Sequence, residues 1–99
     1  MPTFVLMTKL AAGSLRDPGG VRTTGKEWFH KVKECCPDVR WVAHYALLGP
    51  YDFMDIYDAP DAETAQKVSL ISRAEGAVSA ESWQAVPYDR FLQLLETVK

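Results

Sequence analysis

The chain has 99 residues with 47% hydrophobic content, which is enough for one two-layer core and too little for two. We therefore expect a single domain over residues 1–99. The formal net charge is −2 and the 11 Lys and Arg are spread along the chain, so the basic footprint of a nucleic-acid-binding protein is missing. No stretch approaches the roughly 18 apolar residues of a membrane span, and the first residues do not resemble a signal peptide. These features predict a cytoplasmic protein without nucleic-acid or membrane partners.

The first third of the chain predicts a strand and then a helix. Residues 3–10 are apolar or β-branched on both faces, a pattern typical of a central strand. Asp17 is placed to cap a helix whose first residue is Pro18, but a capping-box spacing at Thr24 and three nearby glycines favour a later start. Apolar residues then recur at helical spacing as far as Cys36. We expect an amphipathic surface helix that begins late.

The two cysteines, Cys35 and Cys36, are neighbours at the end of this helix. A disulfide between adjacent residues needs a strained turn in place of helix. We expect both to be free thiols.

A hairpin is predicted in the middle of the chain. Residues 39–48 and 51–58 are rich in β-formers, and Gly49-Pro50 between them fits the centre of a two-residue type II′ turn. With that turn, or with a four-residue loop, the side chain of His44 lies opposite that of Asp55. The residues expected on the same face are Val42, Ala46, Tyr51, Phe53 and Tyr57. Those expected on the other face, under the helices, are Ala43, Tyr45, Leu47, Asp52, Met54 and Ile56.

The last third predicts a helix, a weaker strand and a terminal helix. Asp61 is placed to cap the helix, which stops at Gly76. Residues 77–86 predict a fourth strand, and Pro87 begins a short helix with one apolar side. The order β-α-β-β-α-β plus a C-terminal helix is the ferredoxin-like split βαβ arrangement of the α+β class, with two helices on one face of an antiparallel sheet.

The other face of that sheet has no helix to cover it, although its strands carry large apolar side chains on both faces. A monomer would leave an apolar patch in water. We expect a symmetric homodimer that packs two sheets face to face, with a small-molecule cavity inside that holds the His44 face of the hairpin.

A histidine paired with a carboxylate beside tyrosines suits proton transfer. Asp55 would orient the His44 imidazole and keep it basic, while Tyr51 or Tyr57 donates a hydrogen bond to a substrate oxygen and Phe53 contacts the substrate. The alternative is a structural pair that satisfies two half-buried polar groups and fixes the strand register.

Lys9, Gly49 and Asp52 are less specific signals. Lys9 ends the first strand, where it either binds an anionic substrate or is simply solvated. Gly49 is expected to set the corner of the hairpin. Asp52 either orients a group at the mouth of the cavity or hydrogen-bonds the backbone of the turn, and we expect the second.

Metal and nucleotide chemistry have little support. Glu27 and His30 have the Glu-x-x-His spacing of helical di-metal sites and Glu34 follows them, but all three lie opposite the apolar stripe, as a solvated face does. The sequence has no Cys-x-x-Cys, no closely spaced histidine pair and no Gly-rich phosphate loop. We predict no metal and no cofactor, with haem bound through His44 as the alternative.

The chain resembles the GYD domain family, named for a Gly-Tyr-Asp signature at the second hairpin, over nearly its whole length. The residues that carry the resemblance are Pro2 to Leu10, Tyr45 to Gly49, Tyr51 to Phe53, Ala59 to Asp61, and Pro87, with Pro50 as a one-residue spacer inside the signature. The resemblance implies a dimeric α/β barrel, a superfamily that also holds cofactor-independent monooxygenases, isomerases and haem-handling enzymes. It implies no reaction and no catalytic residue.

The sequence thus favours a small homodimeric enzyme that acts on a small organic molecule by proton transfer at His44, without metal or nucleotide. A non-catalytic metabolite-binding or assembly module is the alternative. An open cavity at His44 and Asp55 favours a ligand site, whereas a fully packed sheet-on-sheet interface favours a scaffold.

Overall fold

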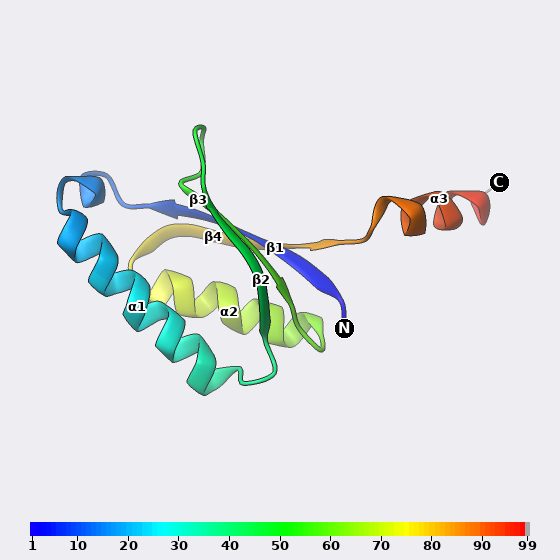
Figure 1. Ribbon diagram of the computed structural model, residues 1–99, viewed down its shortest axis with the longest axis horizontal. Helices are drawn as coiled ribbons and strands as arrows, with labels where there is room; N and C mark the ends of the chain where they lie inside the picture. Colours follow the sequence, from blue (N-terminus) through cyan, green and yellow to red (C-terminus); the bar gives the residue numbers. More distant parts are fainter. Residues whose placement is uncertain (99) are drawn as a thin grey trace.

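The strand β1 (Thr3–Leu10) runs through the middle of the sheet in the computed structural model, which describes residues 1–98. It pairs antiparallel with β3 (Phe53–Asp58) on one side and with β4 (Ala77–Ala85) on the other, and β2 (Arg40–Ala46) pairs with β3 at the edge. The resulting order is β2-β3-β1-β4. With helices in the two crossovers, this is the predicted ferredoxin-like α+β fold (Figure 1).

The helix α1 (Pro18–Cys35) begins earlier than the sequence suggested. The carboxylate of Asp17 accepts a hydrogen bond of 3.0 Å from the backbone N–H of Gly20, which satisfies one amide of the first turn. The expected late start near Thr24 was therefore wrong, because a good cap outweighs the low helix propensity of the glycines behind it. A short 3-10 helix, η1 (Ser14–Arg16), precedes this cap.

The second helix, α2 (Ala62–Ala74), has the predicted cap and stop. The carboxylate of Asp61 accepts a hydrogen bond of 2.8 Å from the N–H of Thr64, and Gly76 takes a positive φ of 106° just after the helix. Together α1 and α2 cover one face of the sheet (Figure 1). No helix within residues 1–98 is long and apolar enough to cross a membrane.

The core lies between these helices and the sheet. The rings of Phe4 and Tyr57 stack with centroids 5.7 Å apart, and they pack with Leu6 against Val32 of α1 and Val68 of α2. The other buried members of this cluster are Cys36, Ala59, Ala65 and Ile71. Both cysteines are free, as expected, with Cys36 buried and Cys35 exposed.

The hairpin keeps the predicted pairing but not the predicted turn. His44 lies opposite Asp55. The last backbone hydrogen bond before the turn runs from Leu47 N–H to Asp52 O at 2.9 Å, so four residues form the loop and the two-residue turn was wrong. A bulge after Trp41 also places that residue, and not Val42, opposite Tyr57. Both loop lengths give the same alternation, which is why the His44–Asp55 pairing survives.

The assignment of the two faces was wrong. Asp55 and Tyr57 share their face with Phe4 and Leu6, which the helices cover. The uncovered face instead carries the side chains of Val5, Met7, Tyr45, Met54, Ile56 and Trp83. Each face of β3 carries two apolar or aromatic residues and one aspartate, so alternation alone could not decide which set lies under the helices.

The C-terminal helix α3 (Tyr88–Glu96) projects away from the rest of the domain (Figure 1). It follows β4 through Val86 and Pro87, which continue the strand direction, and the long axis of the molecule measures 51 Å as a result. This helix and the uncovered sheet face leave two apolar surfaces in solvent.

Candidate functional site

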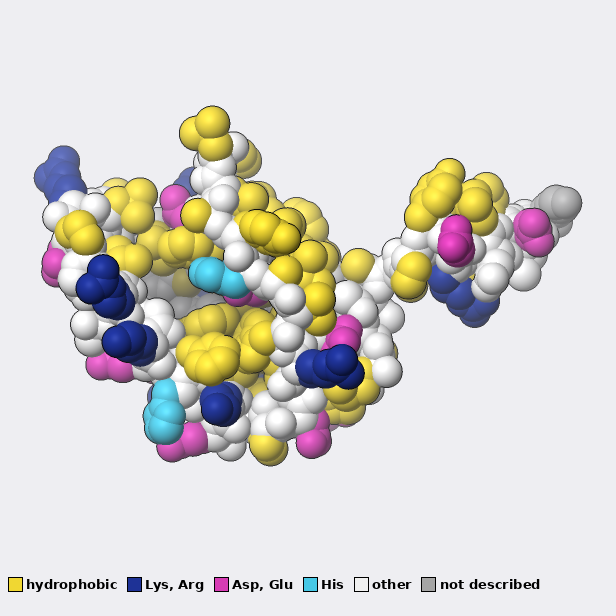
Figure 2. Space-filling view, in the orientation of Figure 1, with side chains coloured by type: hydrophobic (Ala, Val, Ile, Leu, Met, Phe, Trp, Pro, Cys, Tyr) yellow, Lys and Arg dark blue, Asp and Glu magenta, His cyan; other side chains and the backbone are white. Residues whose placement is uncertain are grey.

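A cavity of about 620 Å³ lies between the sheet and the N-terminal half of α1, where the surface is hollowed (Figure 2). Val21, Gly25 and Trp28 line it from α1, and Thr8 and Phe53 line it from the sheet. A second hollow of about 570 Å³ adjoins it, and both share Trp28 and Gly25. The size suits a small organic molecule.

Two glycines of α1, Gly20 and Gly25, line this cavity. A Cβ added at Gly25 would meet no atom within 4 Å, so the missing side chain leaves room above the sheet. At Gly20 a Cβ would lie 2.5 Å from Oδ2 of Asp17, so the helix cap itself requires a glycine there. Two of the three glycines that suggested a late helix start therefore lie at the cavity.

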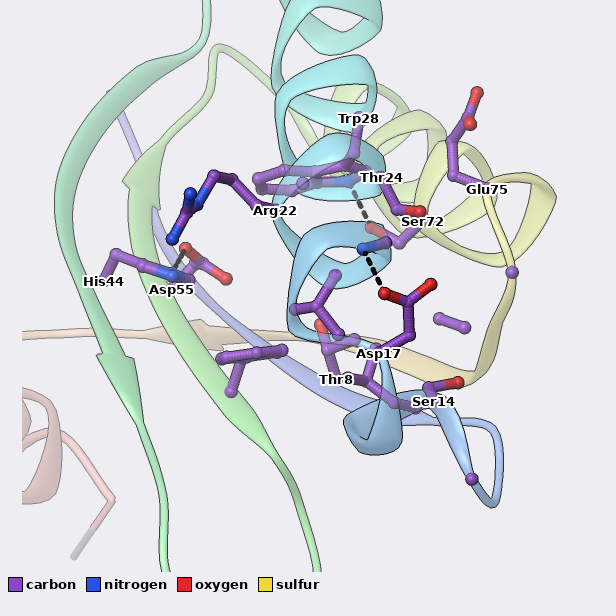
Figure 3. Close-up of a pocket in the computed structure, with 18 residues that line it drawn as sticks. Thr8, Ser14, Asp17, Arg22, Thr24, Trp28, His44, Asp55, Ser72 and Glu75 are labelled. Carbon is purple, nitrogen blue, oxygen red and sulfur yellow. Dashed lines mark hydrogen bonds and ion pairs between the residues drawn. The ribbon is translucent and has the colours of Figure 1, made fainter.

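His44 of β2 and Asp55 of β3 stand together at the cavity wall (Figure 3). Nδ1 of His44 is hydrogen-bonded to Oδ1 of Asp55, and the ring of Phe53 stacks on the imidazole with centroids 5.5 Å apart. Asp55 is 4% exposed, whereas the His44 side chain is 61% exposed. Burial raises the pKa of Asp55 above its ordinary value, and the neighbouring His44 acts in the opposite direction.

This arrangement determines which imidazole nitrogen is free. With Asp55 ionised, Nδ1 of His44 must carry the proton that it shares with the carboxylate, since a carboxylate can only accept. The lone pair of neutral His44 is then on Nε2, the nitrogen that does not bond Asp55. A largely exposed imidazole backed by a buried carboxylate can accept a proton from a bound molecule.

Arg22 is a cavity residue that the sequence reasoning missed. Its side chain extends from α1 across the cavity toward His44 and Asp55 (Figure 3). The early start of α1 places Arg22 in the first turns of the helix, so the signal that could have found it was the Asp17-Pro18 start. A guanidinium here supplies positive charge beside the proton acceptor.

The two tyrosines do not join His44. Tyr57 is fully buried in the core, where its hydroxyl lies 2.7 Å from Oγ of Ser82, and burial raises its pKa to about 12. The hydroxyl of Tyr51 donates a hydrogen bond of 2.7 Å to Oε2 of Glu81, beside Trp83 on the uncovered face. The expected cluster of His44 and Asp55 with a tyrosine on one cavity face was therefore wrong, whereas Phe53 does lie beside His44.

Lys9, Gly49 and Asp52 lie outside the cavity lining. Lys9 is exposed and points to the face of β1 opposite Thr8, while Gly49 lies in the hairpin loop. The carboxylate of Asp52 accepts a hydrogen bond of 2.8 Å from Leu10 N–H, so it ties the hairpin to β1 and not to the turn backbone.

On the charged side of α1, His30 and Glu34 form an exposed pair on the helix surface. Nε2 of His30 lies 2.9 Å from Oε1 of Glu34, and both side chains are exposed. Across residues 1–98 no group of three His, Cys, Asp or Glu side chains is arranged to hold a metal ion.

Comparisons with known proteins agree on a family and a fold. A family model described as "GYD domain" matches residues 4–95. The "Glutamine synthetase and cystathionine beta-lyase binding protein" of Thermus thermophilus is 32% identical over 91 residues, which is 88% of this chain and 90% of that protein.

Solved structures support the fold at low sequence identity. The crystal structure of TTHA0845 from Thermus thermophilus has a TM-score of 0.59 and 19% identity, covering 88% of this chain and 95% of that one. The hypothetical protein PHS023 from Pyrococcus horikoshii has a TM-score of 0.53 and 17% identity, covering 88% and 92%. At these identities the likeness extends to the fold alone.

Proposed function

This chain belongs to the GYD domain family, and membership alone does not indicate a reaction. From the side chains of this protein, we propose that the cavity binds a small organic molecule and that His44 accepts a proton from it. The observation that carries the proposal is the free imidazole edge of His44 beside an open cavity, with a buried Asp55 behind it. The chemistry needs no metal or nucleotide, because the imidazole itself is the base.

The lining indicates what kind of molecule fits. Trp28, Phe53 and Leu10 provide apolar walls, and Arg22 provides one cation. A compact molecule with an acidic C–H beside a carbonyl suits this set. Nε2 of His44 would take the proton, the electron pair would move onto the carbonyl oxygen, and Arg22 would stabilise the resulting anion until the proton returns.

Hydrogen exchange from the ligand tests this proposal without knowledge of a product. Carbonyl compounds that raise the melting temperature of the protein are incubated with it in D₂O, and loss of their acidic C–H signal is followed by NMR. We expect wild-type protein to catalyse exchange and His44→Asn to lower the rate by at least about 10²-fold, the usual contribution of a general base. His30→Asn, which changes the exposed histidine of α1, is the matched control and should exchange normally.

The outcomes separate catalysis from binding. Exchange that is equal in wild type and His44→Asn overturns the role of the base. Binding without any exchange in wild type supports the alternative, a metabolite-binding domain in which the His44–Asp55 pair is structural.

Protein binding is a second candidate function. The observation that favours it is the 32% identity of this chain to the Thermus relative, which is named as a binding protein for glutamine synthetase and cystathionine beta-lyase. Light scattering of this protein mixed with each purified enzyme tests the candidate, with the Thermus relative as positive control. A complex with either enzyme supports it, whereas no change in mass with both enzymes removes it.

We also propose that the protein associates with a second copy of itself. The uncovered sheet face carries Tyr45 and Trp83, which are 54% and 47% exposed. A homodimer in which each copy covers this face of the other would take its apolar surface out of water. Light scattering at micromolar concentration should give about twice the mass of the 11.1 kDa chain, and a monomer would exclude the dimer.

A further inference from the structure

The helix α3 has a strongly one-sided distribution of apolar residues that no part of its own domain covers. Tyr88, Phe91, Leu92 and Leu95 recur at the i, i+3, i+4 and i+7 positions of one helix face. With Leu94 and Val98 they are between 40% and 75% exposed. Figure 2 shows hydrophobic side chains of this helix gathered on its upper side, with basic side-chain atoms below.

Alone, α3 is too short to be a stable helix. It has nine residues and no side-chain cap at its N-terminus, and isolated helices below roughly 12 residues are marginal in water. Within residues 1–98 its hydrogen bonds all stay inside the segment 87–98. The helix therefore needs packing that the protomer does not supply.

The connection to β4 directs α3 away from its own sheet. Pro87 has φ −57° and ψ 148°, an extended conformation that Pro stabilises, and it follows Val86 directly after the end of the strand. Folding back onto the same protomer would require a reversal at this proline. The α3 surface is consequently placed to meet a different molecule.

The chain has a second exposed apolar surface, on which the apolar side of α3 could pack. The uncovered sheet face presents Tyr45 and Trp83 around Met54 and Ile56. We propose that α3 is an exchanged arm: in an assembly of two copies, the apolar side of α3 from one protomer packs on the uncovered sheet face of the other. A two-fold axis makes the exchange reciprocal, so neither surface remains free.

The surface area is sufficient for a stable dimer. Each arm offers six large apolar side chains, of order 100 Å² apiece at their observed exposure, or roughly 600 Å² per arm. Two arms and the two faces that receive them reach the range of about 2,000 Å² that is typical of stable homodimers. The inference rests on the self-association proposed above, and it adds the part of the chain that holds the two copies together.

Matched variants of the full chain test the role of α3 in assembly. Leu95→Asp places a charge on the apolar side, and Gln93→Asp places the same charge on the polar side. Because each dimer buries two copies of Leu95, we expect Leu95→Asp to raise the dimer dissociation constant by roughly tenfold or more. Gln93→Asp should leave it within about twofold. Equal dissociation constants for both variants and wild type overturn the exchanged arm while leaving a dimer made by the sheets alone.

Photocrosslinking identifies the surface that receives the arm. Phe91 is replaced by benzoylphenylalanine, the protein is irradiated, and crosslinked peptides are mapped by mass spectrometry. A covalent dimer joined to peptides of β2, β3 or β4 supports the proposal. A crosslink within one protomer shows that α3 folds back, and a crosslink between two α3 helices shows that the arms pair with each other; each of these overturns it. A wild-type monomer with rapidly exchanging amides in residues 91–95 overturns both the arm and the homodimer, and leaves α3 as a surface for another protein.

Discussion

Nε1 of Trp28 donates a hydrogen bond of 2.6 Å to Oγ of Ser72, which joins α1 to α2 along the wall of the cavity. Ser72 is 5% exposed and donates in turn to the carbonyl oxygen of Val68 at 3.1 Å. The two helices are also linked at the surface by Lys31 and Glu75, 3.7 Å apart. Trp28 thus lines the cavity and links the two helices beside it.

Removal of this hydrogen bond should destabilise the domain. Trp28→Phe deletes the donor and leaves Ser72 without it, so we expect the free energy of unfolding to fall by about 1–3 kcal/mol in urea titrations. The double variant Trp28→Phe, Ser72→Ala should lose less than the sum of the two single variants, with a coupling of about 0.5–1.5 kcal/mol. Strict additivity would show that the contact contributes nothing.

Gly25 lines the cavity, so a large side chain at this position is a direct way to fill it. A Cβ at this position enters open space, so Gly25→Ala should gain up to about 1 kcal/mol of stability from helix propensity without loss of ligand binding. Gly25→Trp places a large ring in the same space and should weaken binding of any ligand found by thermal shift by at least tenfold. If the Trp variant binds as well as the Ala variant, the ligand occupies another part of the protein.

The buried carboxylate of Asp55 gives the stability a specific pH dependence. Its pKa is raised in the folded protein from the ordinary 3.8, chiefly by burial, so its contribution to stability is full below pH 3.8 and is lost as the pH rises through the folded pKa. Asp55→Asn lacks this titration. The free energy of unfolding of Asp55→Asn relative to wild type should therefore increase as the pH rises from 3 toward neutrality, as measured by urea unfolding across that range. A relative decrease would mean that attraction to His44 outweighs the cost of burial.

The fold was predictable because several independent local signals agreed. Asp61 and Gly76 marked the ends of α2, and the apolar or β-branched residues on both faces of β1 marked a central strand, each of them for a reason that acts within a few residues. The His44–Asp55 pairing was also predictable, because every even-numbered loop centred on Gly49-Pro50 places these two residues opposite each other.

The predictions were wrong where the position of a side chain depends on packing between residues far apart in the sequence. Tyr57 goes under the helices because Phe4, Val32 and Val68 form a pocket for its ring there, and these residues are far apart in the sequence. Arg22 lies in the cavity lining because α1 begins directly after the Asp17 cap. The glycines in the first turns had instead favoured a later start of the helix. The candidate site was therefore predicted on the uncovered face of the sheet, whereas it lies between the sheet and α1.

Asp52 of the Gly-Tyr-Asp signature should prove to be a structural residue. Its carboxylate accepts the N–H of Leu10 and its own N–H donates to the carbonyl oxygen of Thr8, both at 2.8 Å. Asp52→Ala leaves the Leu10 N–H without its partner and should cost about 1–2 kcal/mol of unfolding free energy, with faster hydrogen exchange at Leu10. Asp52→Asn retains an acceptor oxygen and should cost less than half as much. A stable Asp52→Ala variant that no longer binds its ligand or partner would instead place this residue in a functional site, outside the cavity described above.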